Sequence, residues 1–287
     1  MKVVMFHYVM EKFNYFHFDV NLFEKYIKIL KERYIIIGLE ETKNLIGQKN
    51  SEDYMMLTFD DGTKDHYKYV YPILKQYNVK GVFFVGTNIF YNEILDIHLI
   101  HRLIAKTGID NLYNDIKLFV EDKKIVINEN KFIKNLDEYK MKYVKQLLQY
   151  VLPQAYRKFI LQKLIDKYDI SQNCNEYYIT YDEMLEMKNK GMEFGIHTRQ
   201  HKRLELLRKN EQKIEIESDL KMMAKKNILA NTKAIAYPFG SYNQTTLKVS
   251  NDLKFDLGFT IKRKFGIQKN LEIERMDCNK LVNEIKI

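Results

Sequence analysis

The 287-residue sequence contains few of the residues that interrupt or cross-link a chain. Only three prolines and eleven glycines occur, which leaves little room for long flexible linkers. The two cysteines, Cys174 and Cys278, stand far apart and form no metal or redox motif, which argues against a disulfide-stapled secreted scaffold. No apolar run approaches the roughly eighteen residues of a membrane span, and the N-terminal region lacks a signal-peptide core. We therefore expect a soluble, cytoplasmic protein without a membrane span.

Basic residues outnumber acidic residues but are not concentrated in any segment. The 47 Lys and Arg against 38 Asp and Glu give a net charge of +9, which suits anionic partners such as nucleic acid, a sugar nucleotide or an acidic membrane surface. However, the basic residues are interleaved with acidic ones along the chain, so solvated helix faces explain most of the charge. Without a recognition motif or a basic stripe, the sequence does not favour nucleic-acid binding.

Apolar residues alternate between short buried runs and amphipathic stretches. Strands are predicted at residues 2–6, 34–37, 55–59, 81–85, 193–196, 234–237, 257–261 and 271–276, with helices between several of them. This strand–helix–strand rhythm predicts parallel pairing and an α/β architecture, and it leaves a doubly wound sheet and a barrel equally open. Thr180 and Glu183 have the spacing of a capping box, which predicts a helix that ends at Gly191.

The rhythm is interrupted between residues 88 and 176. This stretch is mainly helical, because Leu, Ile, Phe and Tyr recur at three- and four-residue spacing, and a β-rich run at residues 124–127 predicts a hairpin edge. We therefore expect a single domain over residues 1–287, with 88–176 as a mainly helical insertion subdomain that could cover a site.

Two aspartates follow directly after the predicted strand at residues 55–59. The adjacent carboxylates of Asp60 and Asp61 repel each other, and a bound cation would relieve that cost. One carboxylate can ligate a metal while its neighbour accepts a proton from a bound water, and Gly62 allows a sharp backbone turn. The alternative is a solvated Asp-Asp-Gly turn, which by itself is the commoner explanation of such a tripeptide.

Two histidines, His197 and His201, follow a second apolar strand. Side chains four residues apart converge on one metal if the segment forms a helical turn. Taken alone, the pair leaves metal ligation and structural packing about even.

A third segment, residues 236–242, places Pro and Gly after another strand. Its backbone N–H groups can point into a pocket, or the turn can simply join a strand to a helix.

Together these segments resemble the polysaccharide deacetylase family, which shares the NodB homology domain and is of the carbohydrate esterase family 4 type. Residues 58–62 read TFDDG, which is similar to that family's first motif. Residues 197–201 read HTRQH and match its second, H-[ST]-x-x-H, while residues 237–240, YPFG, resemble a variant of its third. The resemblance covers about residues 55–90 and 180–262, together with an N-terminal FHY, but not the predicted insertion.

The resemblance implies a distorted (β/α) barrel with fewer than eight regular strands. It further implies that Asp61, His197 and His201 bind a divalent metal, usually Zn²⁺, although this ligand set would also accept Co²⁺ or Ni²⁺. Asp60 would then act as the general base that takes a proton from the attacking water. The backbone N–H of Phe239 would help to stabilise the tetrahedral oxyanion.

Two positions depart from the family's pattern. Ala236 stands where the third motif often has an arginine that holds the catalytic aspartate, and Arg275, at the end of the last predicted strand, is our candidate to replace it. No histidine follows His201 to serve as the family's general acid. His7, which ends the first predicted strand, is a candidate for that role, and packing beneath the site is the equally weighted alternative.

The expected reaction is metal-dependent hydrolysis of an N-acyl group, most simply N-acetyl, from an amino sugar. A cytoplasmic enzyme would act on a sugar nucleotide, a lipid-linked sugar or another precursor of glycan biosynthesis, with Tyr237, Pro238 and Tyr242 as candidate substrate contacts. The alternatives are a deformylase or an O-acyl esterase that uses the same site, and a non-catalytic metal-containing protein that binds a glycan or a nucleotide sugar. His98 and His101 could form a second metal site, but packing within the insertion explains them more simply.

Overall fold

The structure is a computed structural model that describes residues 1–11, 17–48, 52–123, 125, 136–261 and 269–280. Its main sheet consists of β1 (Lys2–Phe6), β4 (Ile35–Ile36), β5 (Tyr54–Asp60), β6 (Val82–Val85), β7 (Glu193–Ile196), β8 (Ala234–Ala236), β9 (Leu257–Ile261) and β10 (Ile273–Asp277). Each strand lies where the sequence predicted one. A separate pair of short parallel strands consists of β2 (Tyr8–Met10) and β3 (His17–Asp19).

Seven strands of the main sheet close into a ring. Their order is β1-β10-β9-β8-β7-β6-β5, and β5 pairs again with β1, with Phe6 opposite Phe59. All of these pairings are parallel, while β4 pairs with the first residues of β5. A closed ring of seven parallel strands joined by helical segments is a distorted (β/α) barrel. This confirms the predicted fold and resolves the choice between a barrel and an open sheet.

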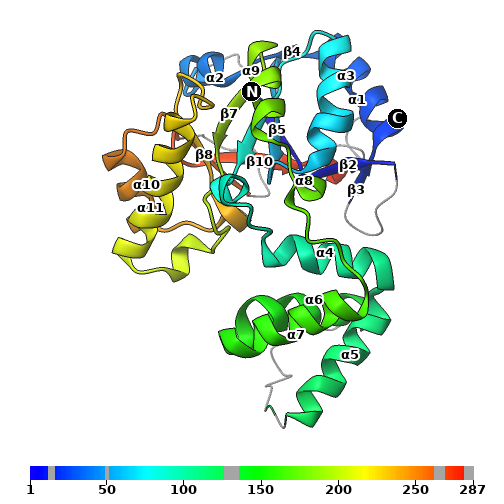
Figure 1. The fold of residues 1–287 in the computed structure, drawn as a ribbon. Helices are drawn as coiled ribbons and strands as arrows, with labels where there is room; N and C mark the ends of the chain where they lie inside the picture. Colours follow the sequence, from blue (N-terminus) through cyan, green and yellow to red (C-terminus); the bar gives the residue numbers. More distant parts are fainter. Residues whose placement is uncertain (12–16, 49–51, 124, 126–135, 262–268, 281–287) are drawn as a thin grey trace. The chain divides into compact units, whose positions relative to one another are not determined.

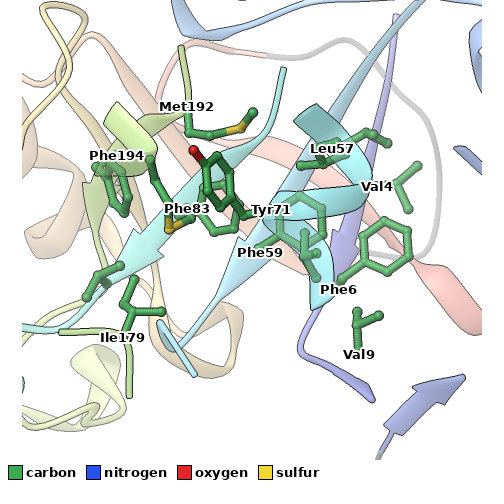
Figure 2. Packing of buried hydrophobic residues seen from close by; sticks show 14 of the residues in the cluster. Val4, Phe6, Val9, Leu57, Phe59, Tyr71, Phe83, Ile179, Met192 and Phe194 are labelled. Atoms are coloured by element: carbon green, nitrogen blue, oxygen red, sulfur yellow. The ribbon is translucent and has the colours of Figure 1, made fainter. Parts of the chain in front are cut away.

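Successive residues along the strands belong to two different hydrophobic clusters. Phe6, Phe59 and Phe83 lie in the larger cluster, shown in Figure 2, together with apolar residues of the surrounding helices. The alternate residues form the second cluster, in which the rings of Phe84 and Phe259 lie 5.1 Å apart. Because β6 and β9 are not neighbours in the ring, that contact crosses the interior of the barrel. The strands are therefore buried on both faces, as expected of a parallel sheet.

The helical segments of the barrel unit are α1 (Val20–Arg33), α2 (Leu39–Leu45), η1 (His66–Val70), α3 (Tyr71–Gln76), η2 (Thr87–Tyr91), α9 (Tyr181–Asn189), η5 (Leu204–Leu206), α10 (Lys209–Lys225), η6 (Pro238–Gly240) and α11 (Gln244–Asp252). Three of these helices, α1, α9 and α11, begin at a side-chain cap. The side chain of Asp19 accepts a hydrogen bond from Leu22 N and caps α1. The predicted capping box of α9 is present: Thr180 Oγ1 accepts from Glu183 N at 3.3 Å, and Glu183 Oε2 accepts from Thr180 N at 2.7 Å.

Removing this cap is expected to destabilise the barrel by a small, measurable amount. Thr180→Ala deprives Glu183 N of its acceptor at the start of α9, and we expect a loss of about 1 kcal/mol in the free energy of unfolding. Thr180→Ser keeps the hydroxyl and should retain most of that stability. Urea denaturation of metal-free protein, followed by far-UV circular dichroism, measures both. Equal stability of the alanine and serine variants would show that the cap contributes nothing.

Residues 94–176 form a second compact unit, and residues 88–93 belong to the barrel unit. The unit contains α4 (Asp96–Thr107), α5 (Ile109–Asp122), α6 (Leu136–Gln146), η4 (Leu147–Val151) and α7 (Gln154–Lys167), which group together in Figure 1, and it ends in the short α8 (Cys174–Tyr177). Buried Leu and Ile side chains line the inner faces of these helices. The hairpin predicted at residues 124–127 lies outside the described residues apart from Ile125. Within the described part of the chain, no helix has the length and apolar character needed to cross a membrane.

Candidate metal centre and its surroundings

The two adjacent aspartates, Asp60 and Asp61, lie at the end of β5. Asp60 is the last residue of the strand, and Asp61 and Gly62 both adopt left-handed backbone conformations, with φ of +74° and +61°. A Cβ on Gly62 would lie 2.8 Å from Cγ1 of Val85, so this position requires glycine. A left-handed aspartate costs on the order of 1–2 kcal/mol, and such strain is concentrated at functional sites. The turn directs two adjacent, buried carboxylates to the same end of the barrel.

The histidine segment follows β7 but does not form the helical turn that we set as the condition for convergence of its imidazoles. Thr198 and His201 have φ of +60° and +48°, and these two left-handed residues fold residues 197–201 into an irregular loop. The imidazoles of His197 and His201 nevertheless converge, with ring centroids 4.9 Å apart. The prediction of convergence therefore agrees with the structure, but the backbone reaches it by chain reversal instead of helical spacing.

The orientation of His197 is fixed by a backbone carbonyl on the neighbouring strand. Its Nδ1 lies 2.8 Å from the carbonyl oxygen of Ala236. Because a carbonyl only accepts hydrogen bonds, Nδ1 carries the proton and Nε2 keeps its lone pair. That Nε2 atom lies 3.5 Å from Asp61 Oδ1 and 4.0 Å from Asp60 Oδ2. This arrangement, a histidine oriented by a carbonyl, is the usual one for metal-ligating histidines.

Asp61, His197 and His201 form a group that fits a divalent metal. One potential ligand atom from each residue lies within 4.8 Å of the others. His201 Nε2 lies 3.4 Å from Asp61 Oδ1, close to the 3.5 Å between Asp61 and His197. Tetrahedral ligands about 2.0–2.2 Å from zinc stand roughly 3.3–3.6 Å from one another. One carboxylate and two imidazoles are suitable ligands for such a site, and the two distances from Asp61 match its spacing.

Arg275 of β10 forms a two-pronged ion pair with Asp60. Arg275 Nη1 donates to Asp60 Oδ1 at 2.7 Å and Nη2 donates to Oδ2 at 2.6 Å. Nη1 also donates to Thr58 Oγ1 at 3.2 Å. Arg275 and Asp60 are each only 1% exposed. Sequence analysis named Arg275 as the substitute for the missing third-motif arginine, and the structure places it in direct contact with this aspartate. The hydrogen bond from Arg275 to Thr58 was not predicted from the sequence.

This ion pair decides the charge of Asp60. Burial by itself would raise the pKa of this carboxyl group, but the charge and the hydrogen bonds of the Arg275 guanidinium hold the pKa below its ordinary value. Asp60 is therefore ionised at neutral pH and can accept a proton. The same ion pair makes it a weaker base than an unpaired carboxylate.

In the third candidate segment, residues 236–242, the ring of Phe239 lies against His201. Phe239 has φ of +58° within η6, and its ring lies 4.6 Å from that of His201, centroid to centroid. Tyr237 is fully buried, and its hydroxyl donates to the carbonyl of Leu271 at 3.0 Å, which argues against the substrate contact expected for it. Pro238 is also buried. Tyr242 is half-buried and stacks on Tyr237 with ring centroids 5.3 Å apart.

His7 follows β1, at the same end of the barrel as the metal group. The register that pairs Phe6 with Phe59 places His7 beside Asp60, and its side chain is half-buried. The backbone here is held by η1, because His66 Nε2 lies 2.6 Å from the carbonyl oxygen of His7. His7 thus stands where a proton donor could serve the site.

The second histidine pair, in the helical unit, lacks the features of a metal centre. His98 and His101 lie on α4 with ring centroids 6.3 Å apart. Among the described residues, no third histidine, cysteine or acidic side chain joins them to form a potential metal group. His98 is 2% exposed, in agreement with packing inside this unit.

The chain is a closed (β/α) barrel with a potential Asp-His-His metal site and a buried Asp–Arg pair at the carboxyl ends of its strands. These features place it among barrel proteins that carry a metal site at this end. The family model described as polysaccharide deacetylase matches residues 47–110 and 128–258, well over half of the chain. The chain therefore belongs to the polysaccharide deacetylase family. The match extends into residues 88–176, which we had expected to lie outside the resemblance.

Individual relatives are distant. YxkH of Bacillus subtilis (strain 168), itself only provisionally described as a polysaccharide deacetylase, is 22% identical over 242 residues, which is 83% of this chain. The chain spans 56% of the length of that relative. The Streptococcus pyogenes deacetylase PplD, solved in complex with acetate, is 21% identical, with a TM-score of 0.61 over 96% of this chain and 91% of that one. A de-N-acetylase from Aggregatibacter actinomycetemcomitans is 16% identical, with a TM-score of 0.58 over 96% and 93%.

Proposed function

We propose that the protein is a metal-dependent hydrolase that removes an N-acyl group, most simply N-acetyl, from an amino sugar of a glycan or a glycan precursor. The main support is the position of Asp60, a buried and ionised carboxylate 4.0 Å from Nε2 of His197. A site that only bound a metal would not need this second aspartate or the arginine that keeps it charged. Metal-dependent amide hydrolysis uses both a metal and a nearby proton acceptor.

Each part of the site has a distinct task in this reaction. Asp61, His197 and His201 would hold the metal, and a divalent metal supplies a Lewis acid that lowers the pKa of water and polarises the acyl carbonyl. Asp60 accepts the proton of the attacking water. The backbone N–H of Phe239 donates to the oxygen that becomes negatively charged.

The departing amine needs a proton, and His7 is the proposed donor. It stands beside Asp60 at the same end of the barrel. A histidine can exchange protons near neutral pH, which suits it to this role. Half-buried Tyr242 is the remaining candidate for a substrate contact among the aromatic residues of the third segment.

Acetyl is the acyl group that the relatives support. One similar structure is described as a de-N-acetylase, and another holds acetate, the product that an N-acetyl substrate would release. The proposed substrates are therefore acetylated amino sugars, either in a glycan or as a nucleotide- or lipid-linked precursor.

Metal analysis and a substrate panel test this proposal together. The purified protein should contain about one equivalent of zinc or a similar divalent metal. It should release acetate and a free amine in equal amounts from an N-acetylated member of a panel of amino sugars, their oligomers and their nucleotide derivatives. Matched N-formyl and O-acetyl sugars separate a deformylase or an esterase from a deacetylase. Stoichiometric metal without acyl release from any member would contradict the proposal and favour a binding protein.

A further inference from the structure

Helix α10 sends two buried carboxylates toward the histidine loop. The sequence of α10 is rich in charged residues, and its pattern did not indicate that any of them is buried. In the structure, Glu215 is 8% exposed and Asp219 is fully buried. They are four residues apart and therefore lie on the same face of the helix. Buried carboxylates are rare unless they are paired or hydrogen-bonded, so their partners show what they hold in place.

These partners are backbone N–H groups at and beside the metal loop. Gln200 N donates to Glu215 Oε1 at 2.6 Å, and Thr87 N donates to Asp219 Oδ1 at 2.7 Å. Burial raises the pKa of Asp219 to about 7, and the charge of Glu215 adds to the rise, whereas hydrogen bonding from Thr87 and the backbone of Thr198 opposes it. Glu215 thus binds the backbone of the 197–201 loop directly, whereas Asp219 binds the backbone of Thr87, which follows Gly86, the residue that lies against Thr198.

The loop needs such support because its backbone is strained. Thr198 and His201, both non-glycine, have positive φ values, and each conformation costs on the order of 1–3 kcal/mol unless the surroundings enforce it. The loop also packs closely against the chain that follows β6: a Cβ on Gly86 would lie 2.5 Å from the carbonyl oxygen of Thr198. Gln200, whose N–H binds Glu215, stands between the two strained residues.

We propose that Glu215 and Asp219 are positioning residues that hold the His197–His201 loop in the conformation in which both imidazoles face Asp61, and that they thereby set the affinity for the metal. The proposal rests on the metal site of the proposed function, but not on the reaction. A loop released from these two carboxylates would have to be ordered at the moment of metal binding. The conformational cost would then reduce affinity, although all three ligands remain in place.

Metal affinity, measured without substrate, tests this role. Protein stripped with a chelator is titrated with Zn²⁺ against a competing indicator, and with Co²⁺ while its visible absorption is recorded. Glu215→Ala should raise the Kd for Zn²⁺ by about 10- to 100-fold and shift the Co²⁺ absorption bands. Glu215→Gln, whose amide oxygen can still accept from Gln200 N, should stay within about threefold of wild type. Asp219→Ala should weaken binding in the same direction.

The matched control is Glu217→Ala on the same helix. Glu217 is partly exposed and pairs with Lys221 at 2.7 Å, so its loss should leave the Kd unchanged. If Glu215→Ala does not fold, Glu215→Asp serves in its place. The aspartate keeps the charge, but its side chain is one methylene group shorter, so its oxygen lies farther from Gln200 N. Metal binding should therefore also weaken.

The outcomes separate this proposal from the proposed function. Equal affinities of wild type, Glu215→Ala and Glu217→Ala would overturn the positioning role alone. Weakened metal binding in Glu215→Ala, restored in Glu215→Gln, would support it even if wild-type protein released no acyl group from any sugar. Failure of wild-type protein to bind Zn²⁺ or Co²⁺ would overturn both.

Discussion

Replacing Asp60 by asparagine should lower kcat for deacetylation by about 10²- to 10⁴-fold, the usual contribution of a positioned proton acceptor. The amide has nearly the same shape, and it can still accept a hydrogen bond from Arg275. It cannot take a proton from the attacking water. Because Asp61, His197 and His201 are untouched, we expect the metal content to stay near that of wild type. Release of acetate from the best substrate of the panel, with metal analysis of the same sample, measures both.

Asp53→Asn provides the matched control. Asp53 is exposed and precedes the opposite end of β5, so its change should leave kcat and metal content as they were. A fully metal-loaded Asp60→Asn variant that retained a third or more of the wild-type kcat would rule out Asp60 as the general base. Loss of the metal in that variant would instead assign Asp60 a role in metal binding.

Removing the guanidinium of Arg275 should cost about 3–5 kcal/mol of folding free energy. Arg275→Met leaves the ionised Asp60 buried without its two strongest hydrogen bonds, and an uncompensated buried charge of this kind is destabilising by that amount. Arg275→Lys keeps the positive charge but loses the fork that binds both carboxylate oxygens, so an intermediate loss is expected. Urea denaturation of the metal-free protein, followed by far-UV circular dichroism, gives these values.

Two further variants separate the ion pair from a general effect of losing an arginine. Arg208→Met removes an arginine whose side chain is 87% exposed and paired only at the surface with Glu211, so its effect should be within about 0.5 kcal/mol. The double variant Asp60→Asn/Arg275→Met removes the buried charge together with its partner and should be more stable than Arg275→Met alone. If the double variant were the less stable of the two, the loss would come from packing around residue 275 and not from the unpaired carboxylate.

The positions of the strands along the chain were predicted well because the signals in the sequence are local. Apolar runs mark β5 and β7, and in each case polar, chemically active side chains follow the last strand residue. Parallel strands bring their carboxyl ends to one edge, which is why Asp61 and His197 could be expected to meet. The capping box at Thr180 was readable for the same reason, since it depends on residues only three positions apart.

Residues 197–201 do not form the helical turn that was the condition for convergence of the two histidines, because spacing alone does not fix a backbone path. Left-handed conformations at threonine and histidine are intrinsically unfavourable, so no propensity rule would assign them to Thr198 and His201. They persist because contacts distant in sequence hold them, including Gln200 N on Glu215, fifteen residues later. The burial of Glu215 and Asp219 on α10 was not predicted for the same reason, because periodicity does not show that backbone N–H groups lie next to two carboxylates of this charged helix.

The sequence by itself determined the chemistry of the site: which residues can ligate a metal, which can take a proton, and that both follow parallel strands. Only the tertiary structure decided how these groups are held. Closure of the ring between β1 and β5 brings β10 to the site, so that Arg275 meets Asp60 across 215 positions of sequence. Such pairings depend on strand order and register over the whole barrel, and no local pattern encodes them.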